Sequence, residues 1–216
     1  MSAEGQNAFS SQNAFPRGWA ALLGVLFGGT ALFGFYNLHR SLLPLAGQKN
    51  WGGFIAQLFF ATSFYVFLAH AAGASFRLAD PEDGPRGKSP VGKYPAGAGC
   101  LLDLAMAFLL YVMIAAVTSP RPTDSTLIVF SAASLWHLAA MARRFLALRE
   151  RGRPLLESRA LRAHLPILGA YVLLLYLWAN FFVDPVEDFR KSFDFLWVIC
   201  AVTLWGSLWR AGEWPD

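Results

Sequence analysis

Few ionisable side chains fall inside the long apolar stretches of this sequence. They are His70, Asp103, His137, His164 and, nearer one end of its stretch, Asp194. An ionisable group is costly to place within a lipid bilayer, so its presence there is by default a functional hypothesis. These residues are therefore the first candidates for chemistry.

The most suggestive of them are Asp103 and His137. They lie on consecutive apolar segments joined by the short turn of residues 119–124, so the two segments should be antiparallel neighbours. Ser131 and Ser134 precede His137 at intervals of three and give its segment a polar flank. A carboxylate beside an imidazole suits a proton relay, because small shifts move histidine titration across neutral pH. The alternative, which we favour, is that both groups are satisfied locally and only fix helix packing.

Haem binding is a further use of these histidines. Two neutral imidazoles from different helices can ligate one iron, and His70, His137 and His164 are expected in the same leaflet. The histidines paired along one helix that mark two-haem cytochromes are absent from the sequence. A single b-type haem therefore stays as an alternative, whereas we predict no metal site, because no second carboxylate or thiolate lies nearby.

Motifs of common catalytic sites are absent from the sequence. It contains no GxSxG, no HExxH and no glycine-rich phosphate loop. Cys100 and Cys200 lie in separate apolar segments and are expected to be small core residues rather than a redox pair. An enzyme is therefore the least favoured class of function.

The composition indicates which elements carry the candidate residues. Of 216 residues, 56% are hydrophobic and 15% charged, whereas a soluble domain has about 25% charged residues. At about 20 residues per crossing, the chain holds about six transmembrane helices, in an all-α polytopic bundle spanning residues 18–210. The helices are predicted at residues 18–38, 52–72, 96–117, 124–142, 165–183 and 193–209, with His39 and Arg40 in the first loop, a polar N-terminal tail at 1–17 and a C-terminal tail at 211–216. The segment at 124–142 is the least apolar, so five crossings stay an alternative.

An arginine-rich segment sets the orientation of the bundle. It follows the fourth predicted helix and contains Arg143, Arg144, Arg149, Arg151 and Arg153. Such a cluster marks the cytoplasmic side, so six crossings place both termini in the cytoplasm and the protein in the inner (plasma) membrane. We expect these five arginines to contact anionic lipid headgroups. The headgroups also explain the net charge of +4 without a nucleic-acid partner.

Three hypotheses for function follow. The first is a non-catalytic subunit or assembly partner of a larger membrane complex, which fits the aromatic-rich helices and the Gly24–Gly28 spacing, a GxxxG pattern that lets helices approach closely. The second is a small transporter or channel that uses the Asp103–His137 pair. The third is a single-haem redox subunit. The expected partners are membrane lipids and other membrane subunits or another copy of the chain.

Overall fold

The described part of the chain is entirely helical. A computed structural model describes residues 14–79, 98–120, 125–150, 159–181 and 188–212, and in these ranges it has six α-helices and no strand. The helices are α2 (Ala14–Gly47), α3 (Trp51–Ala79), α4 (Ala98–Val117), α5 (Thr126–Glu150), α6 (Arg159–Phe181) and α7 (Asp188–Gly212). This confirms the all-α prediction.

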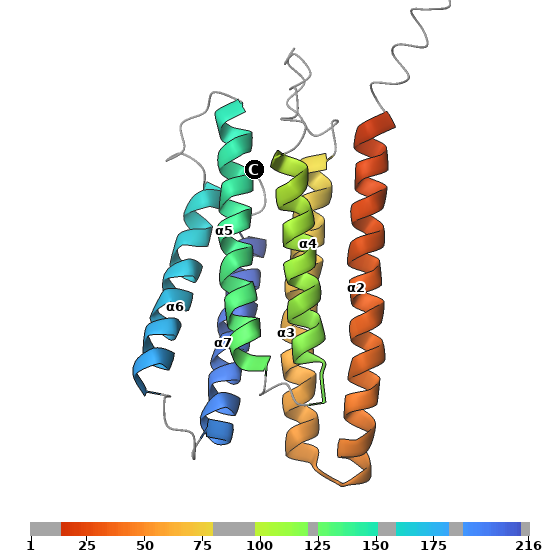
Figure 1. Cartoon of the computed structure of the whole chain (residues 1–216), viewed down its shortest axis with the longest axis vertical. Helices are drawn as coiled ribbons and strands as arrows, with labels where there is room; N and C mark the ends of the chain where they lie inside the picture. The colour runs from red at the N-terminus through yellow and green to blue at the C-terminus, as the bar shows by residue number, and fades with distance from the viewer. Residues whose placement is uncertain (1–13, 80–97, 121–124, 151–158, 182–187, 213–216) are drawn as a thin grey trace, which may run out of the picture.

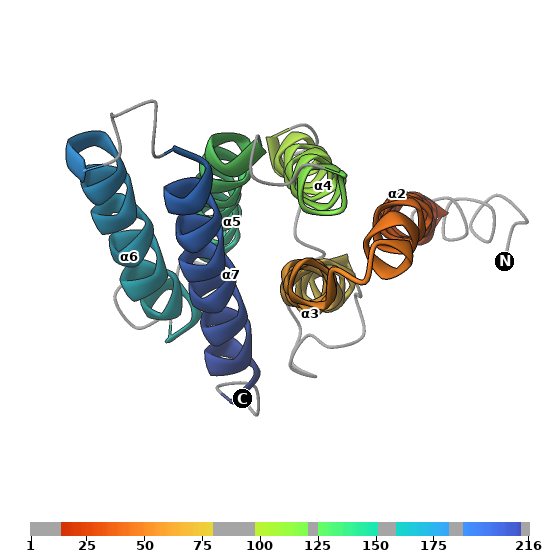
Figure 2. The same cartoon turned by 90° about the horizontal axis from the view of Figure 1, so that it is seen from below.

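Consecutive helices alternate in direction and form two groups of three (Figure 1). Helices α2, α3 and α4 contact one another, and so do α5, α6 and α7. The groups meet where α4 packs on α5 and where α3 packs on α7, which leaves α2 at one edge of the bundle and α6 at the other (Figure 2). The connections at residues 48–50 and 118–125 are short, which accounts for the antiparallel packing of α2 with α3 and of α4 with α5.

Four of the helices are long and apolar enough to cross a membrane. The candidate spans are Ala21–Gly47, Trp51–Gly73, Ala98–Val117 and Thr126–Leu146. The last of these lies in α5, which corresponds to the predicted segment at 124–142, the least apolar of the six. The apolar runs of α6 and α7 are shorter, His164–Leu174 and Phe195–Leu208. Many large apolar side chains point outward from the helices, and this surface indicates a membrane-embedded protein.

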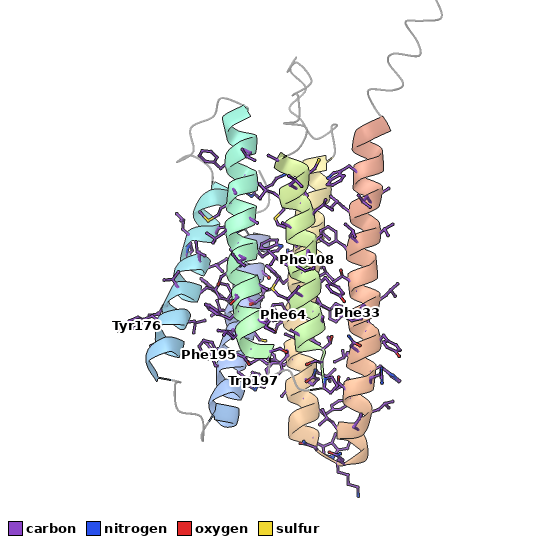
Figure 3. All side chains as sticks on the ribbon, viewed as in Figure 1. Phe33, Phe64, Phe108, Tyr176, Phe195 and Trp197 are labelled. Carbon is purple, nitrogen blue, oxygen red and sulfur yellow. The ribbon has the colours of Figure 1, made fainter. Side chains whose placement is uncertain are left out.

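The interior is built on the aromatic side chains of α3. Phe60, Phe64 and Phe67 are fully buried. Trp197 of α7 stacks on Phe59 with ring centroids 4.2 Å apart, which joins the two groups of helices. Figure 3 shows Phe64 and Trp197 between the helices, whereas Tyr176 projects from the outer side of α6. Aromatic pairs of this kind stabilise helix contacts beyond the area that they bury.

The first helix is longer than predicted. It continues through His39 and Arg40, which were expected in a loop, and ends at Gly47. The end is a Schellman motif: the amide of Asn50 donates to the carbonyl of Leu45, and that of Lys49, with φ of 56°, donates to Ala46. Asn50 then accepts a hydrogen bond from the Gly53 amide and caps α3. The helix therefore runs through the polar residues at 39–41 and includes a second apolar run at 42–46.

Buried polar side chains satisfy the C-terminal end of α4. The Gln57 amide donates to the carbonyls of Val117 and Ser119 at 2.7 and 3.2 Å. The Ser41 hydroxyl donates to the Thr118 carbonyl at 2.8 Å. The last carbonyls of a helix have no partner within it, so Gln57 and Ser41 act here as structural caps supplied by α3 and α2.

Candidate functional site

The first buried polar cluster joins three helices through an ion pair. The Nε of Arg143 (α5) donates to Oδ1 of Asp103 (α4) at 3.0 Å, and both side chains are 6% exposed. The indole nitrogen of Trp19 (α2) donates to the other carboxylate oxygen at 3.4 Å. Gly99, one turn before Asp103, leaves room for the guanidinium, because a Cβ there would lie 3.3 Å from its central carbon. The cluster links α2, α4 and α5.

This cluster is suited to packing rather than to proton transfer. An arginine side chain keeps its proton in proteins, so the Asp103–Arg143 pair has no proton to pass on. The two opposite charges compensate each other's desolvation, and the bond from Trp19 satisfies the second carboxylate oxygen. The ion pair therefore fixes how the three helices meet.

The predicted Asp103–His137 contact is not formed. Asp103 bonds to Trp19 and Arg143 instead, and His137 bonds to a residue of another helix. Arg143 lies six residues beyond His137, about 9 Å farther along the helix axis. The expectation that Arg143 contacts lipid headgroups is also wrong, because its side chain is buried against the carboxylate. A carboxylate within reach of an arginine and an indole is satisfied without an imidazole.

The second buried cluster is a pair of imidazoles. The Nδ1 atoms of His137 (α5) and His164 (α6) lie 3.1 Å apart, and the two residues are 1% and 3% exposed. Three aromatic rings lie close to His137, with ring centroids at 5.7 Å for Phe67, 5.3 Å for Trp136 and 5.5 Å for Tyr171. Trp136 also lies 6.3 Å from His164. Helices α3, α5 and α6 therefore enclose the pair.

The hydroxyl groups of Tyr171 and Thr203 connect this enclosure to α7. Thr203 donates to the carbonyl of Ile199 at 2.8 Å, so its oxygen accepts the hydrogen bond from Tyr171, at 2.5 Å. Ser207 donates to the Thr203 carbonyl at 2.8 Å. Sequence reasoning missed Tyr171, Thr203 and Ser207 because it considered only ionisable groups at membrane depth. The available signal was spacing: Tyr171 follows His164 by seven residues and Ser207 follows Thr203 by four, which place each pair on one helix face.

The imidazole pair does not fit the haem hypothesis in this arrangement. An iron held between the two Nδ1 atoms would need a bond of about 2 Å to each, but the atoms are only 3.1 Å apart. The rings of Phe67, Trp136 and Tyr171 occupy the space around His137. His70 is half-buried on α3. In the described ranges, no group of three His, Cys, Asp or Glu residues could hold a metal ion.

The remaining predicted residues do not share one surface. Ser131 is exposed, and Ser134 has a buried hydroxyl without a hydrogen-bond partner among the described residues. Arg144 is half-buried, while the side chains of Arg149, Arg151 and Arg153 lie outside the described part. Gly28 is exposed and Gly24 half-buried. Only His137 of the predicted polar flank on α5 points fully into the interior.

Comparison of the chain with models of known families, with curated protein sequences and with solved structures finds no match. The two buried clusters and the outer surface of the bundle are therefore the basis for assigning a function. Of these, the ion-pair cluster serves packing, which leaves the imidazole pair and the helix surfaces.

Proposed function

We propose that this chain is a six-crossing membrane protein that acts as a non-catalytic subunit or assembly partner of a larger membrane complex. The observation that carries the proposal is an apolar face of α2 that points away from the bundle. This helix is the longest of the six, lies at the edge of the bundle and packs against α3 and α4 (Figure 2). Its outward side is free to meet another membrane helix.

This α2 face consists of Val25, Gly28, Gly29, Leu32 and Tyr36, which occupy positions i, i+3, i+4, i+7 and i+11 and so lie on one side of the helix. Val25 and Leu32 are 71% and 72% exposed. A Cβ added at Gly28 or Gly29 would meet no atom within 4 Å. The face therefore has a notch of two glycines between large apolar side chains. Small residues at such a notch let a second helix approach closely, and this packing drives helix association in lipid.

The occupant that we propose for the notch is a helix of a different subunit. The interior of the chain supports a structural role, because its buried ion pair and its Gln57 and Ser41 caps all join helices to one another. A second copy of the chain would need the same face on both molecules, which is the alternative outcome of the association experiment below.

Replacing Gly28 with leucine should release the partner without unfolding the chain. The leucine fills the notch and keeps the helices apart, so we expect the co-purified partner to fall by about tenfold, which corresponds to about 1.4 kcal/mol. The matched control is Gly169→Leu, because Gly169 lies on α6 at the opposite edge and a Cβ there also meets nothing within 4 Å. The measurement is quantitative mass spectrometry after purification in mild detergent. A wild-type chain that purifies alone, or only with copies of itself, would refute the proposal.

The proposed orientation places the arginine-rich end of the bundle in the cytoplasm. The ends of α3 and α5 and the start of α6 lie at one end (Figure 1). These segments carry Arg77, Arg143, Arg144, Arg149, Arg159 and Arg162. The opposite end carries fewer basic residues, Arg40, Lys49, Arg190 and Lys191. This imbalance favours a cytoplasmic arginine-rich end in a plasma or inner membrane.

Reporter tags give a direct test of this topology. A tag inserted in residues 151–158 and a tag at the C-terminus should both report the cytoplasm, whereas a tag in the turn at residues 48–50 should report the other side. Six crossings require this alternation. If the 151–158 tag reports the cytoplasm and the C-terminal tag reports the outer side, the chain crosses the membrane an odd number of times after α5. The six-crossing topology would then be wrong.

A further inference from the structure

We infer that the partner helix in the α2 notch carries a carboxylate, which pairs with Arg40 at one end of the α2 face. This pairing rests on the proposed function and adds to it the chemistry by which the partner is recognised. Arg40 lies one turn beyond Tyr36, the last residue of that face, and both side chains are exposed. A helix that occupies the notch and follows the α2 face therefore reaches the guanidinium.

Arg40 lies inside an apolar stretch of α2 rather than at its end. It belongs to the candidate span Ala21–Gly47, and a second apolar run at residues 42–46 follows it. An arginine within a membrane span usually faces the interior of its own bundle and pairs there. Arg40 is exposed instead, and it forms no ion pair with a residue that the structure describes. Its counter-charge is therefore expected on another molecule.

The depth of Arg40 in the membrane follows from the contact of its neighbour with α4. The span Ala98–Val117 has 20 residues, which is about 30 Å of helix and matches the thickness of the hydrocarbon core. Ser41 donates to the carbonyl of Thr118, just beyond the end of this span, at 2.8 Å. The backbone of Arg40 therefore lies at the edge of the hydrocarbon core.

The guanidinium of Arg40 folds back toward the middle of the membrane. Its central carbon lies 5.6 Å from the centre of the Tyr36 ring, which is one turn nearer to the middle of the span, in a cation–π contact. An arginine that bound lipid phosphates would extend the other way, toward the headgroups. The ring covers one face of the guanidinium, and the planar edge of N–H groups is suited to a bidentate carboxylate.

The charge of this part of the chain also favours an acidic partner. Residues 14–79, which form α2, α3 and the turn between them, contain four Lys and Arg residues but no Asp or Glu. A complementary charge on the partner gives specificity and fixes the register of the two helices. Gly28 is separated from the Tyr36–Arg40 pair by about 8 to 12 residues, or roughly 12–18 Å along the axis. The partner's carboxylate should lie at that distance from the residue that enters the notch.

Carbodiimide cross-linking of the Arg40→Lys variant tests the pairing directly. A lysine keeps the positive charge and supplies a primary amine, which a membrane-permeant carbodiimide couples as an amide to a carboxylate in contact with it. We expect this variant to retain the partner and to form a cross-link from position 40 to an Asp or Glu in an apolar helix of that partner. Mass spectrometry of the cross-linked peptides identifies the carboxylate. The wild-type chain is the matched control and should give no cross-link from position 40.

Removal of the charge measures how much the pairing contributes to association. Arg40→Gln should lower the amount of co-purified partner by about thirtyfold, as expected when one member of a desolvated charge pair is removed. Lys49→Gln removes a charge from the exposed turn at the same end of the bundle and should leave the partner bound. Arg40 is exposed, so its replacement is not expected to unfold the chain.

The outcomes separate this inference from the proposed function. Full retention of the partner by Arg40→Gln would overturn the pairing. A cross-link from position 40 only to a lipid headgroup, or only to a second copy of the chain, would overturn it as well. If Gly28→Leu still releases the partner in these cases, the proposed function stands without the charge pair. A wild-type chain that purifies alone would overturn both.

Discussion

Replacing Arg143 with methionine should lower the free energy of unfolding by about 3–5 kcal/mol. The substitution leaves the Asp103 carboxylate buried with only the 3.4 Å bond from Trp19. A buried charge that loses its partner has a large desolvation penalty, which the remaining neutral donor does not compensate. The measurement is reversible unfolding of the purified protein in mixed micelles of a mild detergent and SDS.

Two matched variants show whether the pair causes this loss. Arg144→Met removes the adjacent arginine, which is half-buried and lies outside the Asp103–Arg143 pair, and should have a much smaller effect. The double variant Asp103→Leu with Arg143→Met removes both charges. It should recover most of the stability, because apolar replacement of a whole buried ion pair is often neutral. If the double variant were less stable than either single variant, the desolvation argument would be wrong.

The sequence was sufficient to predict the helices but not their ends. Each predicted helix overlaps one helix of the structure, since long apolar segments in lipid must satisfy their backbone groups internally. The ends differ because a helix does not stop where the apolar side chains stop. Helix α2 continues through three polar residues at 39–41 and a further apolar run to Gly47. Helix α6 begins at Arg159 rather than at residue 165, since its first residues Arg159, Ala160, Leu161 and Arg162 all favour helix.

The partners of the buried polar groups could not be read from depth alone. His137 and His164 were expected in the same leaflet, and Asp103 was expected beside His137. Contact also depends on rotation about each helix axis. At about 100° per residue, Arg143 and His137 are separated by roughly 120° around α5. Arg143 therefore faces α4 and bonds to Asp103, while His137 faces α6 and bonds to His164.

Rotation also explains why the glycine pattern of α2 was only partly predictable. The spacing of Gly24 and Gly28 can be read from the sequence, but the spacing does not show which glycines face a neighbour in the same chain. In the structure Gly28 faces open space, and Gly34 is the glycine at the crossing of α2 with α3 and α4. A Cβ on Gly34 would lie 2.5 Å from the hydroxyl oxygen of Tyr65 and would also overlap Cγ2 of Ile114.

Replacing Gly34 with alanine should therefore destabilise the chain, by about 1–3 kcal/mol. The methyl group must displace Tyr65, whose hydroxyl donates to the Ala31 carbonyl at 3.0 Å and whose ring stacks on Phe35 with centroids 4.5 Å apart. Alanine stabilises a helix relative to glycine by up to about 1 kcal/mol. The measured loss of stability is therefore the steric cost of the methyl group minus this gain.

The matched control for Gly34→Ala is Gly28→Ala on the same helix. The added methyl group at Gly28 meets nothing within 4 Å, so only the gain in helix propensity remains, and stability in the same micelles should be unchanged or higher. Opposite signs for two identical substitutions six residues apart would establish that α2 packs into the bundle through Gly34 and leaves Gly28 outward. Equal effects at both positions would mean that α2 is rotated about its axis, and the outward notch proposed for the partner would then be wrong too.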